Sequence, residues 1–293
     1  MSRTGILIRA VSSFYDVGTD SGQVIRCRAR GHLRYEKSDP VPGDQVLYEP
    51  DPVHQGSGIL TRVLPRRNHL IRPSIANVDQ ILFIATAARP KTDPFLIDMA
   101  SVVAAENNCR LILCLNKADL DSADELFQIY HSCGFHVIRT SAISGTGMDE
   151  LRSILQGKLS VLTGNSGVGK TSLLNQLLDG VSEKTGDISP KYGRGRHTTR
   201  RTELYPLPAG GWLADTPGFS AMEIHMISAL GSQELKTCFP DFPQGKCRFQ
   251  DCLHDKEPDC AVQEGVHSHM ISTSRYQSYL RMLDEFKKTE RSR

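Results

Sequence analysis

The chain has 293 residues, of which 39% are hydrophobic and 23% are charged, and its formal net charge is +2. These values indicate a folded globular protein of about two domains, with room for a small third, and exclude a highly charged disordered chain. No run of about 18 apolar residues occurs, so no membrane span is expected. The start, MSRTGILIRA, lacks the apolar core and cleavage site of a signal peptide, which predicts a cytoplasmic protein.

The first 65 residues contain short β-type segments that are separated by Gly, Asp and Pro. These segments cover residues 6–8, 14–17, 24–27 and 45–48. Several short strands in a unit of this size predict a small β-barrel, and a five-stranded OB-fold is the natural candidate. An SH3-like barrel would give the same pattern.

Between residues 66 and 222 the pattern changes to alternating strands and helices. The expected strands cover residues 81–85, 111–115, 135–140 and 158–163. The expected helices between them cover residues 94–107, 122–132 and 147–155. Alternation of this kind predicts a parallel sheet covered by helices, and ligands bind such sheets at the carboxyl ends of the strands.

A phosphate-binding loop follows the strand at 158–163. The residues GNSGVGKT match G-x-x-x-x-G-K-[ST] in full, and helical residues 173–178 follow, as this motif requires. Its glycines let backbone N–H groups face a β-phosphate, Lys170 would lie between the β- and γ-phosphates, and the Thr171 hydroxyl would coordinate Mg²⁺. The predicted phosphate-site residues are Gly164, Asn165, Ser166, Gly167, Val168, Gly169, Lys170, Thr171 and Ser172.

Two further motifs predict that the base is guanine. The predicted base-site residues are Asn116, Lys117, Ala118 and Asp119 (NKxD), together with Ser141 and Ala142. The Asp119 carboxylate can accept from guanine N1–H and the 2-amino group, a donor pair that adenine lacks. The Asn116 amide can bond another base edge, the Lys117 stem can cover the ring, and Ser141 and Ala142 offer backbone N–H groups to O6. A buried polar site of this kind rejects the wrong base strongly, so we predict GTP or GDP as the ligand.

Asp215-Thr216-Pro217-Gly218 follows a strand-like segment and predicts the γ-phosphate end of the site. Asp215 can reach Mg²⁺ through water, and the Gly218 amide can bond the γ-phosphate. Either Thr198 or Thr199 would be the switch threonine that binds Mg²⁺ in the GTP state. The pattern does not choose between them.

The catalytic group is a separate question. Phe219 follows the Asp-Thr-Pro-Gly motif, where many signalling GTPases have a glutamine that orients water. Intrinsic hydrolysis is therefore expected to be slow, and His197, next to the switch threonines, is the candidate catalytic residue. The alternative is that His197 contacts RNA phosphate or solvent.

The order of these motifs is reversed relative to ordinary GTPases, in which the phosphate loop comes first and NKxD lies near the end. Domain termini often lie close together, so a domain can be reopened at a loop and rejoined at its old ends. We therefore predict an α/β protein with a circularly permuted P-loop GTPase domain at residues 66–222. It would lie between the OB-fold barrel at 1–65 and a third domain at 223–293.

The third domain is predicted to bind one structural zinc ion. Cys247, Cys252, His254 and Cys260 have the spacing C-x4-C-x-H-x5-C, and four N/S ligands without a vacancy are what structural Zn²⁺ prefers. The surrounding stretch has little apolar material to fold it without a metal. His267 and His269 exceed a complete ligand set and are interpreted as surface residues. A basic helical tail is expected from residue 275 onward.

Two basic runs favour a polyanion such as RNA as partner. One run contains Lys191, Arg194, Arg196, Arg200 and Arg201, and the other contains Arg62, Arg66, Arg67 and Arg72. Either run alone could be a solvated face, but two runs around a nucleotide site favour binding of nucleic acid.

Taken together, these motifs resemble those of the small-ribosomal-subunit-dependent GTPase A family (RsgA, also called YjeQ). The similarity covers the whole chain: an OB-like start, then NKAD, TSA, GNSGVGKTS, GRGRHTT and DTPGF in permuted order, then C-x4-C-x-H-x5-C. The resemblance implies a cytoplasmic factor in late small-subunit maturation, with GTP hydrolysis stimulated by the subunit and rRNA contacts from the barrel and zinc domains. A monomer is expected.

Two other functions fit the same residues. One is an RNA-binding sensor of guanine nucleotides with little turnover, which Phe219 supports. The other is a permuted GTPase that serves a different RNA.

Overall fold

The computed structural model describes residues 2–19, 22–29, 39–178, 202–215 and 230–291. The chain forms two units. One contains residues 1–80, 152–162 and 174–219, and the other contains residues 81–151, 163–173 and 220–293. The domain limits expected at residues 65 and 222 stay predictions.

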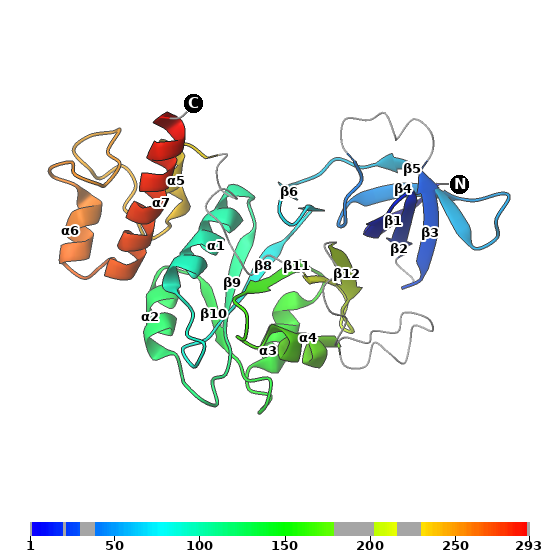
Figure 1. The fold of residues 1–293 in the computed structure, drawn as a ribbon, viewed down its shortest axis with the longest axis horizontal. Coiled ribbons are helices and arrows are strands. Elements are labelled where there is room, and N and C mark those ends of the chain that lie inside the picture. Colours follow the sequence, from blue (N-terminus) through cyan, green and yellow to red (C-terminus); the bar gives the residue numbers. More distant parts are fainter. Residues whose placement is uncertain (1, 20–21, 30–38, 179–201, 216–229, 292–293) are drawn as a thin grey trace. The chain divides into compact units, whose positions relative to one another are not determined.

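The N-terminal strands close into a barrel (Figure 1, blue). Its strands are β1 (Arg3–Val11), β2 (Phe14–Gly18), β3 (Val24–Ala29), β4 (Gln45–Pro50) and β5 (Ser57–Val63). They follow the order β1-β2-β3-β5-β4, with β3 and β5 parallel and the other described pairs antiparallel. The predicted five-stranded OB-like barrel is therefore confirmed.

Alternation of buried and exposed residues explains the barrel core. Along β4, for example, Val46 and Tyr48 are buried, whereas Gln45 is exposed and Leu47 and Glu49 are half-buried, because successive side chains of a strand point to opposite faces. The core residues are Leu7, Val17, Cys27, Val46, Tyr48 and Leu60. After the barrel come two short strands, β6 (His69–Leu70) and β7 (Ile75–Ala76), which pair with each other.

A six-stranded sheet follows, in the order β10-β9-β8-β11-β13-β12. Its strands are β8 (Gln80–Ala85), β9 (Arg110–Leu115), β10 (His136–Arg139), β11 (Leu159–Gly164), β12 (Glu203–Pro206) and β13 (Trp212–Asp215). β10 runs parallel to β9 and β11 runs parallel to β13, as predicted. β12 is an antiparallel edge strand that the pattern did not predict.

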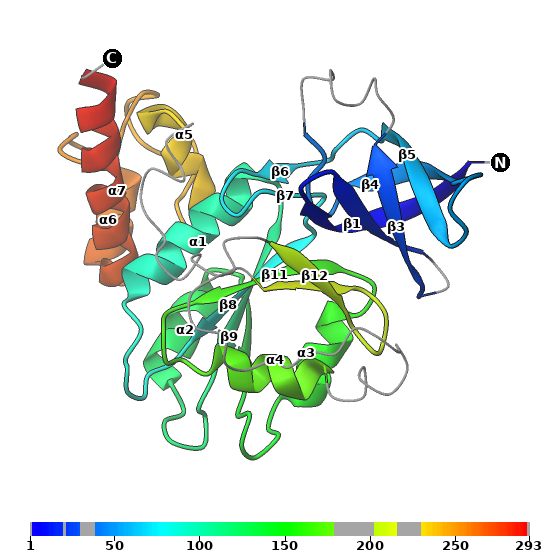
Figure 2. The ribbon, with the colours of Figure 1, turned by 45° about the vertical axis from the view of Figure 1, so that its right-hand side comes forward.

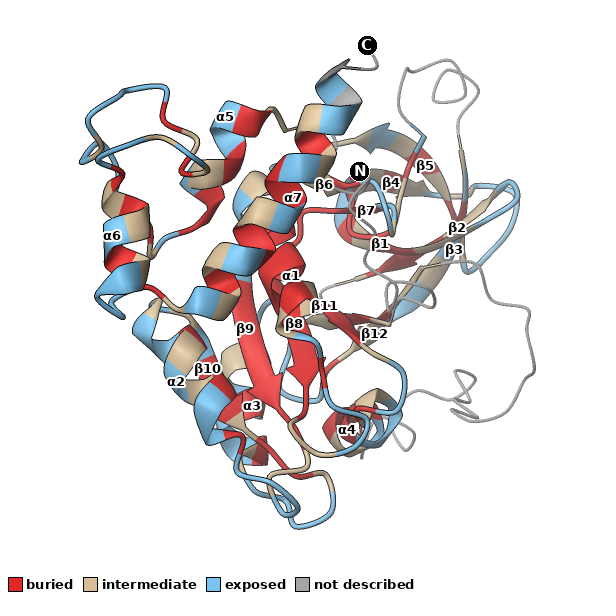
Figure 3. Ribbon diagram, turned by 60° about the vertical axis from the view of Figure 1, so that its left-hand side comes forward, coloured by how far each residue is buried: buried red, intermediate tan, exposed pale blue. Residues whose placement is uncertain are grey.

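The central strands β8 and β11 are buried at every residue, which is typical of parallel strands (Figure 3). Between the strands lie helices α1 (Pro94–Glu106), α2 (Asp124–Ser132), α3 (Met148–Leu155) and α4 (Lys170–Leu178). α1 begins at Pro94 because the side chain of Asp93 caps it, accepting from the Phe95 N–H at 3.0 Å. The predicted α/β class is confirmed.

The C-terminal part contains α5 (Ser232–Leu235), the 3₁₀ helix η3 (Lys236–Cys238), α6 (Ala261–His267) and α7 (Thr273–Arg291). α7 packs against α1 (Figure 2). None of the helices in the described ranges is long and apolar enough to cross a bilayer.

Arg275, where the basic tail was expected to begin, is fully buried in α7. Its guanidinium forms ion pairs with Asp98 of α1 at 2.7 Å and with Asp241 at 2.6 Å. Tyr130 of α2 donates to the same Asp98 oxygen at 3.0 Å, and the guanidinium also lies 4.9 Å from the ring centroid of Phe239. This residue therefore fastens α7 to α1 and α2, and it is not a free surface charge.

Candidate guanine-nucleotide site and metal centre

The loop between β11 and α4 has the backbone that its glycines predict. Gly164 and Gly169 have φ angles of 137° and 97°, a region that favours glycine. A Cβ at Gly164 would collide with the carbonyl oxygen of Ile84 on β8, and a Cβ at Gly169 would collide with the Asn116 side chain. Both glycines are therefore needed for conformation and for close packing.

Lys170 folds back over this loop. Its Nζ donates to the carbonyl oxygens of Gly164 at 2.6 Å and Asn165 at 2.5 Å. Thr171 and Ser172 are exposed in the first turn of α4, where the helix dipole and N–H groups favour an anion. The loop thus presents a cation, two hydroxyl groups and a helix N-terminus together.

Asn116 connects the NKxD loop to the phosphate loop. Its Nδ2 donates to the Val168 carbonyl oxygen at 2.8 Å, and its Oδ1 accepts from the Thr140 hydroxyl at 3.3 Å. Asn116 is only 3% exposed, so both bonds are shielded from water. These contacts hold the two loops together, and Thr140 is a partner beyond the predicted site residues. The contact of the Asn116 amide with a base edge stays a prediction.

Hydrogen bonds to main-chain carbonyl oxygens also hold the next two residues of the NKxD turn. Lys117 has a φ of 64°, and its Nζ donates to the Arg89 carbonyl oxygen at 2.8 Å. The Ala118 N–H donates to the Thr140 carbonyl oxygen at 3.0 Å. The Asp119 side chain, the predicted reader of guanine, is exposed at the end of this turn.

Ser141 shapes the neighbouring loop. Its buried Oγ accepts from the N–H groups of Ile143 at 3.2 Å and Ser144 at 3.1 Å. Its own N–H, predicted to face guanine O6, donates to the Thr146 carbonyl oxygen at 3.1 Å. Ala142, the second residue predicted there, is half-buried.

Asp215 is the last residue of β13, aligned with Leu162 of β11, and it is half-buried. This is the strand end at which a magnesium ligand was expected. The other predicted residues of this part of the site, His197, Thr198, Thr199 and Gly218, lie outside the described residues.

The four predicted zinc ligands come together. Cys247, Cys252, His254 and Cys260 place their ligand atoms within 4.8 Å of one another. The three Sγ atoms lie 3.4–3.5 Å from His254 Nδ1, and the Sγ atoms of Cys247 and Cys260 lie 4.0 Å apart. Tetrahedral zinc with ordinary bond lengths requires about 3.6 Å between S and N and about 3.8 Å between two S atoms. The donor set therefore fits a structural Zn²⁺ ion.

Burial by itself opposes the ionisation of these ligands. Burial raises the pKa of Cys252 to about 12 and lowers the pKa of His254. Burial alone therefore favours neutral thiols, and a bound divalent cation supplies the charge that turns them into thiolates.

Glu257 stabilises the ligand loop. Its carboxylate accepts from the N–H groups of Leu253 at 2.9 Å, Asp255 at 2.9 Å and Lys256 at 3.1 Å. Burial acts to raise the pKa of Glu257, but these backbone donors outweigh it and hold the pKa below the usual value. Glu257 lies between the ligands His254 and Cys260 in the sequence, and this position is the signal that could have predicted its role.

Helix α7 supports the same loop from the other side. The hydroxyl groups of Tyr276 and Tyr279 donate to the carbonyl oxygens of His254 and Leu253, both at 2.7 Å. Lys287 forms an ion pair with Asp255 at 2.9 Å. The metal loop is thus held against a long helix that Arg275 fastens to α1.

The phosphate loop, the NKxD turn and the loop at Ser141 all follow strands of one α/β sheet, and NKxD precedes the phosphate loop along the chain. This combination defines a circularly permuted P-loop GTPase. The family model described as RsgA GTPase matches residues 63–225, and the RsgA N-terminal domain model matches residues 4–59. The chain belongs to the RsgA GTPase family.

Similar proteins cover the chain almost completely. The small ribosomal subunit biogenesis GTPase RsgA of Caldanaerobacter subterraneus subsp. tengcongensis is 42% identical over 99% of this chain and 97% of its own length. The protein of the same name from Bacillus pumilus is 41% identical over 97% of each chain.

Two solved structures agree with the fold. The crystal structure of YjeQ from Thermotoga maritima has a TM-score of 0.81 at 35% identity, over 98% of this chain and 99% of that one. The structure of YloQ, titled a circularly permuted GTPase, has a TM-score of 0.81 at 32% identity, over 99% of this chain and 96% of that one.

Proposed function

We propose that this protein hydrolyses GTP as an assembly factor of the small ribosomal subunit. The observation that carries the proposal is the hydrogen bond from Asn116 to Val168, because it joins a guanine-type loop to a phosphate-type loop in one buried unit. The relatives that match nearly the whole chain are named small ribosomal subunit biogenesis GTPases, and these names support the assembly role.

Nucleotide binding would use the residues predicted for it. Asp119 would accept from guanine, and the backbone N–H groups of residues 164–169 with Lys170 would hold the phosphates. The Thr171 hydroxyl, Asp215 and one of Thr198 and Thr199 would hold Mg²⁺, which neutralises charge that develops on the phosphates. His197 is our candidate for orienting the attacking water.

The protein's partners would be GTP or GDP, the small subunit and its rRNA. We propose three domains, at residues 1–65, 66–222 and 223–293, with the barrel and the zinc domain contacting RNA. The Cys₃His set would hold one Zn²⁺ as a folding element. We further propose a monomer that acts in the cytoplasm and binds no membrane.

Hydrolysis assays with isolated ribosomal subunits test this function. GTP turnover is measured for the purified protein alone and with small subunits, with large subunits and ATP as controls. We expect a large stimulation that requires both GTP and small subunits. A His197→Ala variant is then expected to bind GTP normally and to lose most of the stimulated rate.

Other outcomes separate the alternatives. Tight, nucleotide-dependent subunit binding without faster hydrolysis would favour a guanine-nucleotide sensor. Hydrolysis that responds to neither subunit would show that the proposed partner is wrong.

A further inference from the structure

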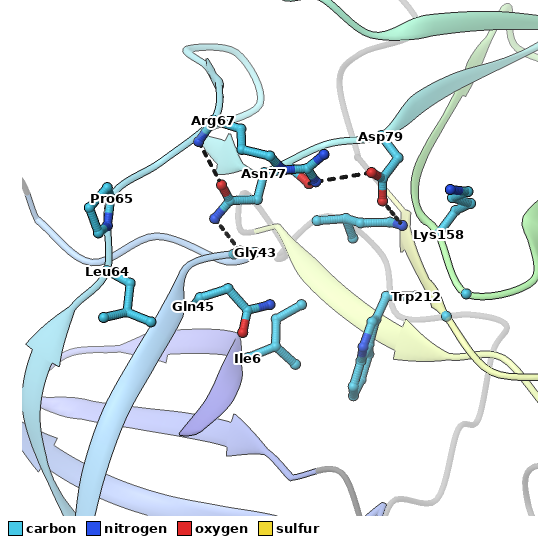
Figure 4. A pocket seen from close by; sticks show the side chains of 13 residues that line it. Ile6, Gly43, Gln45, Leu64, Pro65, Arg67, Asn77, Asp79, Lys158 and Trp212 are labelled. Atoms are coloured by element: carbon cyan, nitrogen blue, oxygen red, sulfur yellow. Dashed lines mark hydrogen bonds and ion pairs between the residues drawn. The ribbon is translucent and has the colours of Figure 1, made fainter. Parts of the chain in front are cut away.

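A cavity of about 590 Å³ lies beside the barrel, and the proposed function does not use it (Figure 4). Barrel residues Ile6 and Gln45 line it together with Leu64. Lys158, the residue before β11, and Trp212, the first residue of β13, also line it. Its volume lies within the usual range for small-ligand sites.

The aromatic wall of the cavity is held rigidly. Trp212 is the only tryptophan of the chain. Its six-membered ring lies against Gly18 of β2, where an added Cβ would come 2.7 Å from the ring. Trp212 is nevertheless only half-buried, and it lines the cavity. A pre-positioned aromatic surface is what a planar ligand needs for stacking.

Three polar residues that line the cavity already form hydrogen bonds with other groups of the protein. Arg67 donates to Asp79 at 2.9 Å, the second Asp79 oxygen accepts from the Leu159 N–H at 2.8 Å, and Asn77 donates to the Gly43 carbonyl oxygen at 3.0 Å (Figure 4). These bonds fix the roof of the cavity and leave that set few groups with which to bind a ligand.

Two other polar side chains that line the cavity, those of Gln45 and Lys158, are available to bind a ligand. Within the described part of the chain, the Gln45 amide and the Lys158 ammonium group have no hydrogen-bond partner. An amide can both donate to and accept from the edge of a base, and an exposed ammonium group binds a phosphate.

An aromatic face, a two-way hydrogen-bonding amide and a cation form the recognition set of a nucleotide. We propose that this cavity binds one nucleotide of single-stranded RNA, with its base against Trp212, its base edge at Gln45 and its phosphate at Lys158. The inference rests on the proposed function only in naming RNA as the polymer.

The emission of Trp212 gives a direct test, because no second tryptophan contributes. The full-length protein is saturated with GDP to occupy the guanine-nucleotide site, and an adenosine hexanucleotide is then titrated. We expect quenching of the Trp212 emission that follows the binding curve measured by anisotropy of the labelled hexanucleotide. Binding with unchanged emission would place the RNA elsewhere and overturn the proposal, and so would an absence of binding.

Variants assign the contacts. Trp212→Leu is expected to weaken hexanucleotide binding about 5- to 150-fold, and Trp212→Phe is expected to retain more affinity because a ring remains. Lys158→Ala changes only an exposed side chain and should lower the slope of log K against log salt by about 0.7. Arg110→Ala removes the same charge from an exposed residue that does not line the cavity, and it should leave the slope unchanged.

The two proposals can fail separately. Quenching by RNA in a protein whose hydrolysis ignores small subunits would refute the proposed function and leave this site standing. Hydrolysis stimulated by small subunits, without quenching of Trp212 and with equal hexanucleotide affinity in Trp212→Leu and wild type, would support the proposed function and refute this RNA site.

Discussion

Asn116 donates a hydrogen bond from its side-chain Nδ2 to the main-chain carbonyl oxygen of Val168 at 2.8 Å. These residues are 52 positions apart, and both are nearly inaccessible to water. In this permuted chain the NKxD loop comes before the phosphate loop. The hydrogen bond between Asn116 and Val168 connects the two loops directly. The NKxD loop and the phosphate-type loop therefore form one structural unit.

Removal of this link is expected to weaken binding of GDP and GTP equally. Asn116→Ala leaves the buried Val168 carbonyl unsatisfied and loosens the two loops, at a cost of about 1–3 kcal/mol. Because each nucleotide would then have to bring the loops back together, we expect a loss of affinity of up to about 5- to 150-fold. Titration with a fluorescent GDP analogue measures it. Asn175→Ala, an exposed change on α4, is the control, and equal affinities of both variants would contradict the role assigned to Asn116.

Loss of one metal ligand is expected to remove the zinc. Cys260→Ser should lower the zinc content from one ion per chain to nearly none and should melt the loop around His254, because its folding depends on the metal. Elemental analysis and limited proteolysis measure the two effects. Cys109→Ser changes a half-buried thiol outside the cluster. If that variant also loses zinc, or if Cys260→Ser keeps it, the ligand assignment is wrong.

The buried ion pairs of Arg275 predict a large effect on stability. Arg275→Ala leaves the carboxylates of Asp98 and Asp241 without their cation, and removal of one partner from a buried pair typically costs about 3–5 kcal/mol. Urea unfolding, followed by the far-ultraviolet signal of the helices, measures this cost. Arg281→Ala, at an exposed position on the same helix, should cost far less.

Asp98 predicts a pH dependence with a definite sign. Burial raises the pKa of its carboxyl to about 6 from the ordinary 3.8, although the charge of Arg275 opposes the rise. Between these two values the folded state holds more protons than the unfolded state, so this group's contribution to stability falls as pH rises. The difference corresponds to at most about 3 kcal/mol.

The variant Asp98→Asn isolates this contribution because it cannot titrate. The stability of wild type relative to Asp98→Asn should fall between pH 4 and pH 7, as measured by the urea midpoint at each pH. A relative stability that rises over that interval would show that the pKa of Asp98 is lowered in the folded protein.

The local sequence pattern was sufficient to predict most strands and helices, and it also predicted the kind of ligand for the phosphate loop and for the Cys₃His cluster. The apolar runs predicted β8, β9 and β11, because parallel strands buried on both faces need continuous apolar side chains. The spacing of the cysteines and His254 predicted the zinc ligands, because few other arrangements place three thiols and an imidazole so close along a chain. The antiparallel edge strand β12 has too short and weak a pattern to be predicted.

The number of basic residues in a run was a poorer guide to which charges are free to bind RNA. Arg66 and Arg67 belong to a run that favoured RNA binding, yet they form ion pairs with Asp44 and Asp79. Arg275 was counted with a basic tail, yet it is buried. The carboxylate partners of these three arginines lie between 12 and 177 positions away, so the local charge count did not reveal the ion pairs.

By itself, then, the sequence determined which residues carry the chemistry suited to guanine, phosphate and zinc, since that chemistry belongs to side-chain type and short spacing. Only the tertiary structure decided which of those groups are used within the protein. It directed the Asn116 amide to Val168 and the Ser141 N–H to Thr146, and it placed Trp212 against Gly18. Such pairings depend on which strands become neighbours, and that is settled by packing of the whole sheet and barrel, which no local pattern encodes.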